Sequence, residues 1–165
     1  MKFSILYARL VTALAMVAGA VFAMMVIAIS IDVVLRSCCA SALFGLGDLT
    51  EYGLAVATFL AAPWVLSKNS HVSVDIVTMT LSVTARRRLG FVVDLLGAAI
   101  CACLFWYVLK ALMIAFDRGS MVRGIIVIPE WLTLASPTVS ALLLAIGFLL
   151  RAFSDKDHEK RAVGL

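Results

Sequence analysis

The stretch LVTALAMVAGAVFAMMVIAISIDVVL, residues 10–35, decides the fold of this chain, because only one charged residue, Asp32, interrupts it. A helix needs about 20 mainly apolar residues to cross the hydrocarbon core of a bilayer, and this stretch is longer. Lys2 and Arg9 before it resemble the start of a secretory signal peptide. The apolar run continues far beyond the roughly 7 to 15 residues of such a peptide, so we expect it to remain as a transmembrane helix.

Three further apolar runs follow, at residues 49–66, 89–116 and 131–150. Each reaches the length of about 18 to 20 residues that a membrane span needs. Hydrophobic residues make up 64% of the 165 and charged residues 15%, whereas a soluble domain is about half apolar and a quarter charged. We therefore exclude a soluble globule and predict an all-α integral membrane protein, in which one four-helix domain occupies residues 1–165.

Lysine and arginine are distributed unevenly between the two sides of the predicted membrane. Ten lie on the side of the N-terminus, the link between the second and third runs, and the C-terminal tail, and four, including Lys110, lie on the other side. Basic residues near helix ends resist translocation, so we expect both termini to be cytoplasmic. The excess explains the net charge of +4 without a nucleic-acid partner, because it faces anionic lipid.

The link between the second and third runs is predicted to form a short interfacial helix. Val72, Ile76 and Met79 recur at helical spacing, so residues 71–85 can lie as an amphipathic helix on the inner membrane surface. Val72, Val74 and Ile76 also alternate as in a strand. An isolated strand would leave its backbone groups unpaired at the membrane boundary, so we favour the helix.

Two acidic residues near the ends of the runs are expected to have nearby partners. Asp32 lies four residues before Arg36, which is the spacing of a helical ion pair. Asp94 lies about five residues into the third run, where Arg86 or Arg87, or a polar residue on another helix, can reach it. Neither carboxylate is at mid-bilayer, so we favour pairing over a proton or ion relay.

Two interpretations are open for Asp48 and Glu51, at the start of the second run. Their spacing is typical of a capping box, in which Asp48 accepts a backbone hydrogen bond and Glu51 reaches back. Alternatively, Glu51 pairs with Arg36 across the outer link and ties the first two helices together. The two interpretations do not exclude each other.

Small and aromatic residues predict how the helices pack and where the fourth one begins. Gly19 on the first helix, and Gly97 with Cys101 on the third, lie on faces of small residues that let backbones approach closely. Pro129 precedes the first turn of the fourth helix. Trp131 follows two residues later and is expected at the membrane interface.

The four cysteines do not form a recognisable redox site. Cys38 and Cys39 are adjacent, where a disulfide would be strained. Cys101 and Cys103 lie about 200° apart around a helix, so they cannot pair. A redox pair is usually spaced C-x-x-C, and we therefore expect no catalytic thiol.

Histidines do not indicate a metal or haem site either. His71 and His158 are the only two, and neither lies within an apolar run, so a haem between the helices would have no histidine ligands. His71 and Asp75 are one turn apart and can contact each other on a helix, but a metal would need a further ligand. We expect no catalytic, metal or cofactor site.

Several motifs occur in order along the chain: Arg36 after the first run, Glu51 at the second, APW at 62–64 with HVSVD at 71–75, and IPEW at 128–131. This arrangement resembles the small, DctQ-type membrane subunit of the tripartite ATP-independent periplasmic (TRAP) transporters. The resemblance covers roughly residues 10–151, and its most specific part is the HVSVD run just after the second helix.

The resemblance implies a division of labour. In this family a large membrane subunit carries the substrate and couples its movement to sodium, a soluble periplasmic protein captures the substrate, and the small subunit supports the large one. Typical substrates are organic acids such as dicarboxylates or sialic acid. The implied location is the bacterial cytoplasmic (inner) membrane, with the large subunit, the periplasmic binding protein and lipid as partners.

We therefore expect a non-catalytic scaffold without a cofactor. The alternative is a free-standing proton-coupled exporter or a four-helix thiol–quinone oxidoreductase. The sequence shows no pair of broken helices of the kind that builds many carriers, which favours the scaffold. The residues expected to hold its structure or to contact a partner are Arg36, Glu51, His71, Asp75, Asp94 and Trp131.

Overall fold

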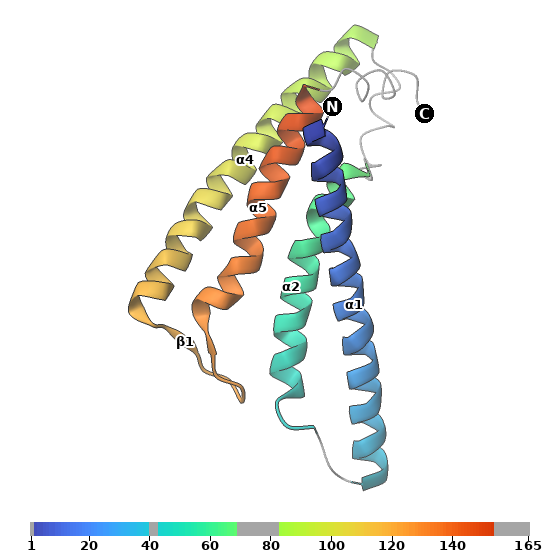
Figure 1. Cartoon of the computed structure of the whole chain (residues 1–165), viewed down its shortest axis with the longest axis vertical. Coiled ribbons are helices and arrows are strands. Elements are labelled where there is room, and N and C mark those ends of the chain that lie inside the picture. Colours follow the sequence, from blue (N-terminus) through green and yellow to red (C-terminus); the bar gives the residue numbers. More distant parts are fainter. Residues whose placement is uncertain (1, 40–42, 69–82, 154–165) are drawn as a thin grey trace.

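The protein consists of two long helical hairpins that lie side by side (Figure 1). The first hairpin contains α1 (Lys2–Cys39) and α2 (Leu46–Ser67), and the second contains α4 (Val83–Arg118) and α5 (Glu130–Ala152). Within the described residues, these four helices are long and apolar enough to cross a membrane, which confirms the predicted all-α, four-helix membrane fold.

The structure is a computed structural model and describes residues 2–39, 43–68 and 83–153. The interfacial helix predicted at residues 71–85 lies outside the described residues except for its last three, which begin α4.

All four helices extend beyond the predicted apolar runs. The first run was expected at residues 10–35, but α1 begins at Lys2 and ends at Cys39. A hydropathy criterion stops at charged residues such as Arg9 and Arg36, whereas a helix accommodates them at its ends because their long side chains reach out of the apolar layer. Each helix therefore continues for at least one residue beyond its apolar run at both ends.

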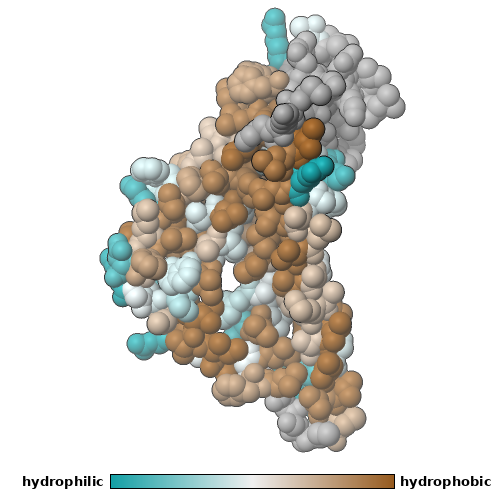
Figure 2. Space-filling view, viewed as in Figure 1, coloured by the Kyte–Doolittle hydropathy of each residue, from teal (hydrophilic) through white to brown (hydrophobic). Residues whose placement is uncertain are grey.

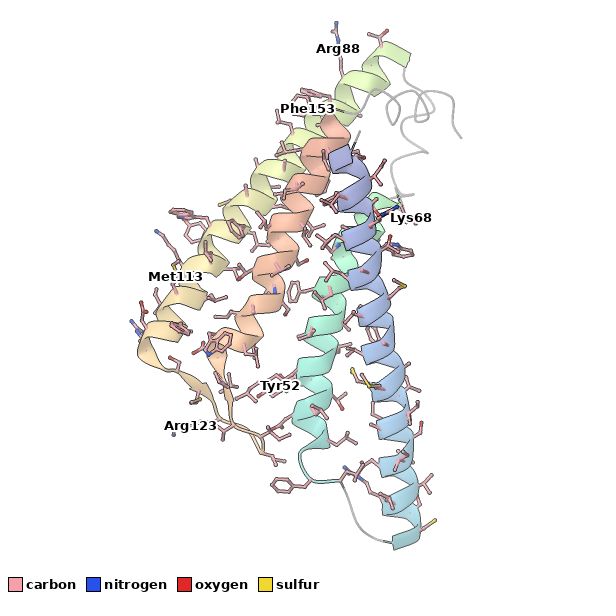
Figure 3. The ribbon with its side chains drawn as sticks, viewed as in Figure 1. Tyr52, Lys68, Arg88, Met113, Arg123 and Phe153 are labelled. Atoms are coloured by element: carbon pink, nitrogen blue, oxygen red, sulfur yellow. The ribbon has the colours of Figure 1, made fainter. Side chains whose placement is uncertain are left out.

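We call the two ends of the bundle the terminal end and the loop end. The terminal end holds the start of α1 and the end of α5, with Lys68, Arg88 and Phe153 near it (Figure 3). The loop end holds the α1–α2 link and the α4–α5 connection, which carries Arg123 (Figure 3).

Helix α5 is the packing centre of the bundle. It contacts both α4 and α2, and α1 packs on α2. Small side chains make these contacts possible, because α5 buries Ser136, Ser140, Ala141, Ala145 and Gly147. The outer faces of α1 and α4 remain exposed and strongly apolar, and Figure 2 shows hydrophobic surface over much of the visible face.

A short β-hairpin connects α4 to α5 at the loop end. Strand β1 (Met121–Val122) pairs antiparallel with β2 (Ile128–Pro129). Gly119 adopts a φ of 61°, in the left-handed region that a glycine reaches without strain, and so allows the chain to turn out of α4. The amide of Glu130 donates to the carbonyl of Ser120 at 2.9 Å and closes the hairpin at the start of α5.

Close helix approach occurs on α4 and α5, as predicted for Gly97, but not at Gly19 of α1. A Cβ on Gly97 would lie 2.8 Å from a ring carbon of Phe148, so the absent side chain makes room for that ring. A Cβ on Gly19 would meet no atom of the described residues within 4 Å. The small-residue face at Gly19 therefore takes no part in the helix contacts of the described bundle.

Candidate functional site

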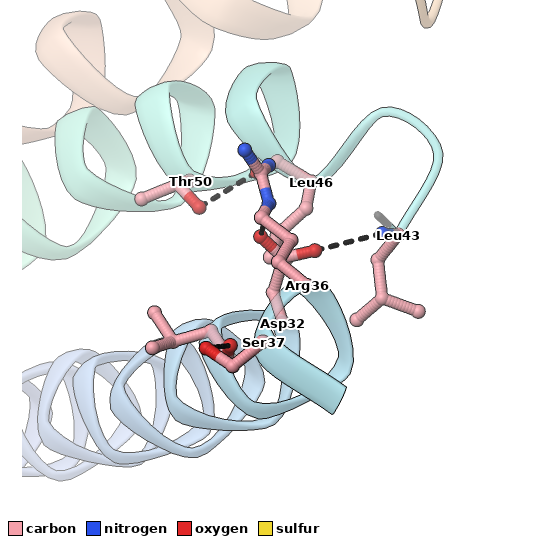
Figure 4. Close-up of polar contacts among 7 residues, drawn as sticks. Asp32, Arg36, Ser37, Leu43, Leu46 and Thr50 are labelled. Atoms are coloured by element: carbon pink, nitrogen blue, oxygen red, sulfur yellow. Dashed lines mark hydrogen bonds and ion pairs between the residues drawn. The ribbon is translucent and has the colours of Figure 1, made fainter. Parts of the chain in front are cut away.

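The polar contacts that join separate segments of the described chain lie toward the two ends of the bundle, and one group at the loop end centres on Asp32 (Figure 4). Arg36 donates from Nε to Oδ2 of Asp32 at 2.7 Å, which confirms the predicted helical ion pair. The other oxygen of Asp32 accepts from the backbone amide of Leu43 at 2.7 Å. Asp32 is buried whereas the side chain of Arg36 is 61% exposed, so the carboxylate anchors the α1–α2 link and the guanidinium faces outward.

The start of α2 differs from both interpretations of Asp48 and Glu51. Helix α2 is preceded by Gly45 in a left-handed conformation with no side-chain cap, so the capping box is wrong. Glu51 is exposed and has no ion pair within the described part of the chain, while Arg36 binds Asp32 instead. The left-handed φ of 73° at Gly45 starts the helix early and places Asp48 inside its first turn.

Asp48 joins the two helical hairpins at the loop end. Its Oδ2 accepts from the backbone amide of Ile126, in the β1–β2 loop, at 2.9 Å. Gly124 and Gly45 permit this approach, because a Cβ on Gly124 would collide with the Asp48 carboxylate and a Cβ on Gly45 would lie 2.7 Å from the Ile126 side chain. Sequence reasoning missed this contact, since the donor is a backbone amide in an irregular loop.

At the terminal end, a buried ion pair joins α4 to α5. Arg151 donates from Nε to Oδ1 of Asp94 at 2.8 Å, and its Nη2 contacts the same oxygen. The side chains of Asp94 and Arg151 are 0% and 10% exposed. The guanidinium carbon also lies 5.1 Å from the centre of the Phe148 ring, which covers the pair. Of the two options open for Asp94, the structure supports the partner on another helix.

A tyrosine joins α1 to α5 at the same end. The Tyr7 hydroxyl donates to the backbone carbonyl of Leu143 at 2.9 Å. Gly147 makes this possible, because a Cβ there would collide with the Tyr7 hydroxyl and lie 3.1 Å from Leu66 of α2. Three helices therefore meet at Gly147. The sequence analysis did not identify Tyr7. The feature that could have indicated a close contact here is Gly147, a glycine within the fourth apolar run.

The remaining candidate residues are not brought into one site. His71 and Asp75 lie outside the described residues. Trp131 packs edge-to-face on Phe116 with ring centroids 6.0 Å apart, which joins the loop ends of α4 and α5. Among the described residues there is no group of three potential metal ligands.

Two lysines lie over tryptophan rings four residues earlier, in very different surroundings. Lys68 at the end of α2 is 5.8 Å from the Trp64 centroid, and Lys110 within α4 is 5.1 Å from that of Trp106. Lys110 lies about 9 Å along the helix from Phe116, inside the third apolar run. The cost of a lysine in a membrane helix reaches about 2.5 to 3.5 kcal/mol only at the helix centre, and an exposed cation–π contact returns about 0.5 to 1 kcal/mol.

Comparison with known families gives one match. A family model described as tripartite ATP-independent periplasmic transporters, DctQ component, matches residues 25–156. No curated protein and no solved structure matches the chain. The matched part runs from the middle of α1 to just beyond α5, so it includes the contacts of both ends of the bundle except that of Tyr7.

Proposed function

Because this chain belongs to the DctQ component family of the tripartite ATP-independent periplasmic transporters, we propose that it is the non-catalytic membrane scaffold of a secondary transporter for an organic acid. The family is not enzymatic, and membership in it removes the thiol–quinone oxidoreductase as an alternative. In this proposal a large sodium-coupled membrane subunit moves the substrate, a periplasmic binding protein delivers it, and this chain holds the large subunit in place.

The observation that best supports the scaffold is that the buried carboxylates bind groups within this chain, while its outer helix faces stay open and apolar. The buried carboxylates of Asp32 and Asp94 bind groups of the chain itself and join its own segments. The outer faces of α1 and α4 are left open and apolar over most of their length. A frame that is braced internally and apolar externally suits a chain that supports a neighbour within the membrane.

The proposed location is the bacterial inner membrane, with the terminal end of the bundle in the cytoplasm. Lys68 and Arg88 lie at that end, and the sequence carries further basic residues in the segments that follow α2 and α5. This excess of positive charge supports the orientation, because basic loops are retained on the cytoplasmic side. Glu51 and Arg36 are then exposed on the periplasmic side, where a binding protein or the large subunit can contact them.

Reconstituted transport tests the proposal. The large subunit, the binding protein and a panel of labelled carboxylic acids are tested in proteoliposomes with an inward sodium gradient, with and without this chain. We expect sodium-dependent uptake only when all three proteins are present, and none with this chain alone. Uptake at the full rate without this chain contradicts the scaffold, and uptake by this chain alone supports the free-standing exporter.

A further inference from the structure

Helix α4 has two opposite faces, and only one of them is covered by other described residues. The face toward α5 carries Asp94, Ala98 and Ala115, all buried. Lys110 lies about 160° around the axis from Asp94, at about 100° per residue, and is exposed. The residues that share its side of the helix, named here the Lys110 face, are exposed too: Leu96, Ile100, Cys103, Trp106, Tyr107 and Ile114.

The contacts between α4 and α5 define how deep Lys110 lies. Asp94 binds Arg151 near one end, and Phe116 packs on Trp131 near the other. On α5, Trp131 and Arg151 are about 30 Å apart along the axis, which equals the thickness of the hydrocarbon layer. On α4, Lys110 lies between the two contact levels, about 9 Å inside that of Phe116, which places it within an apolar layer bounded by those two levels.

The ammonium group of Lys110 lies over an aromatic ring of its own helix. A lysine near a membrane surface extends its ammonium outward along the helix. Here Nζ lies 5.1 Å from the ring centre of Trp106, one turn deeper than Lys110 itself. Figure 2 shows hydrophilic atoms along the free edge of α4, among hydrophobic ones. Among the described residues no carboxylate pairs with Lys110, so its charge lacks an ionic partner inside the bundle.

We propose that the Lys110 face is the surface on which the large subunit docks, through a membrane helix that presents a carboxylate to Lys110. This inference rests on the proposed function, and it adds which side of the bundle makes the contact. Ionisable groups within a membrane pair with one another rather than face lipid. Trp106 and Tyr107, 56% and 67% exposed, flank the lysine with the aromatic side chains that most often anchor protein interfaces.

Co-purification of the large subunit with variants of this chain tests the surface. Lys110→Met removes the charge at similar length, and Lys110→Arg keeps it. Lys68→Met is the matched control, because it removes a lysine that lies over a tryptophan in the same way but at the end of a helix. We expect Lys110→Met to reduce recovery of the large subunit about tenfold or more, since it leaves a buried carboxylate unpaired. Lys110→Arg and Lys68→Met should retain it.

A photoreactive side chain at position 107 provides a second measurement. In membranes that contain both subunits, it should crosslink to the large subunit. Crosslinking to phospholipid alone overturns the inference, and so does unchanged or improved recovery with Lys110→Met, which is the result expected if lipid covers this face. If the unmodified chain binds the large subunit while these tests fail, the docking face is wrong and the proposed function stands. If the unmodified chain recovers no large subunit at all, both are overturned.

Discussion

Two ion pairs in this protein have the same chemistry but different surroundings. Arg36 and Asp32 lie on one helix, and the arginine is 61% exposed, so water screens the attraction. Arg151 and Asp94 lie on two helices with both side chains buried. A buried pair gains little over an apolar pair of similar volume, but loss of one partner leaves an uncompensated charge. The stability of α4 against α5 should therefore depend on Asp94 far more than the α1–α2 link depends on Arg36.

Removal of one charge at each pair measures this difference. We expect Asp94→Ala to lower the free energy of unfolding by about 3 to 5 kcal/mol, because Arg151 stays buried without a counterion. Arg36→Ala should cost about 0 to 1 kcal/mol. The double change Asp94→Leu with Arg151→Met should recover most of the loss. Thermal unfolding in mild detergent, followed by near-ultraviolet circular dichroism, gives the comparison. Equal losses of unfolding free energy for Asp94→Ala and Arg36→Ala would show that the buried pair contributes no more to stability than the exposed one.

At the scale of the elements, glycine determines how closely the helices approach. Gly97 makes room on α4 for the Phe148 ring of α5, and Gly147 makes room on α5 for Tyr7 of α1. Phe148 in turn covers the guanidinium of Arg151. The helix contact and the ion pair are therefore linked through one aromatic ring. Gly19 has the same residue type but no neighbour within 4 Å in the described chain, so the residue alone does not indicate a contact.

A methyl group at Gly97 tests this contact. A Cβ there would lie 2.8 Å from a Phe148 ring carbon, so Gly97→Ala should displace the ring and lower the free energy of unfolding by about 1 to 3 kcal/mol. Gly19→Ala is the matched control and should be neutral or stabilising by up to about 1 kcal/mol, because alanine favours the helix. Thermal unfolding in detergent compares the two variants. A Gly97→Ala protein as stable as Gly19→Ala would mean that Phe148 does not require this space.

For the molecule as a whole, the sequence predicted the helices better than the contacts between them. Hydropathy summed over about 20 residues identifies a span even when its ends are uncertain. Pairing across helices depends on register, which a single sequence does not give. Asp94 and Arg151 were still within reach of prediction, because both lie near the same end of antiparallel helices. The bond from Ile126 to Asp48 was not, since a loop amide has no side-chain signature.

Only the distribution of basic residues predicts which end of the molecule faces the cytoplasm. Ten basic residues against three favour a cytoplasmic terminal end, with Lys110 left out of the count because it lies within α4. The inner leaflet is anionic, and basic loops resist export. Cys38 is exposed at the loop end of α1, and Lys68 is exposed at the terminal end of α2. These two positions therefore report on opposite sides of the membrane.

Labelling of intact cells with a membrane-impermeant maleimide distinguishes the two orientations. One variant keeps Cys38 as its only cysteine, and the other replaces all four native cysteines by serine and carries Lys68→Cys. We expect Cys38 to react in intact cells, and the cysteine at position 68 to react only after the membrane is permeabilised. The reverse pattern would place the terminal end in the periplasm. The exposed side chains of Arg36 and Glu51 would then face the cytoplasm, where no periplasmic binding protein can reach them.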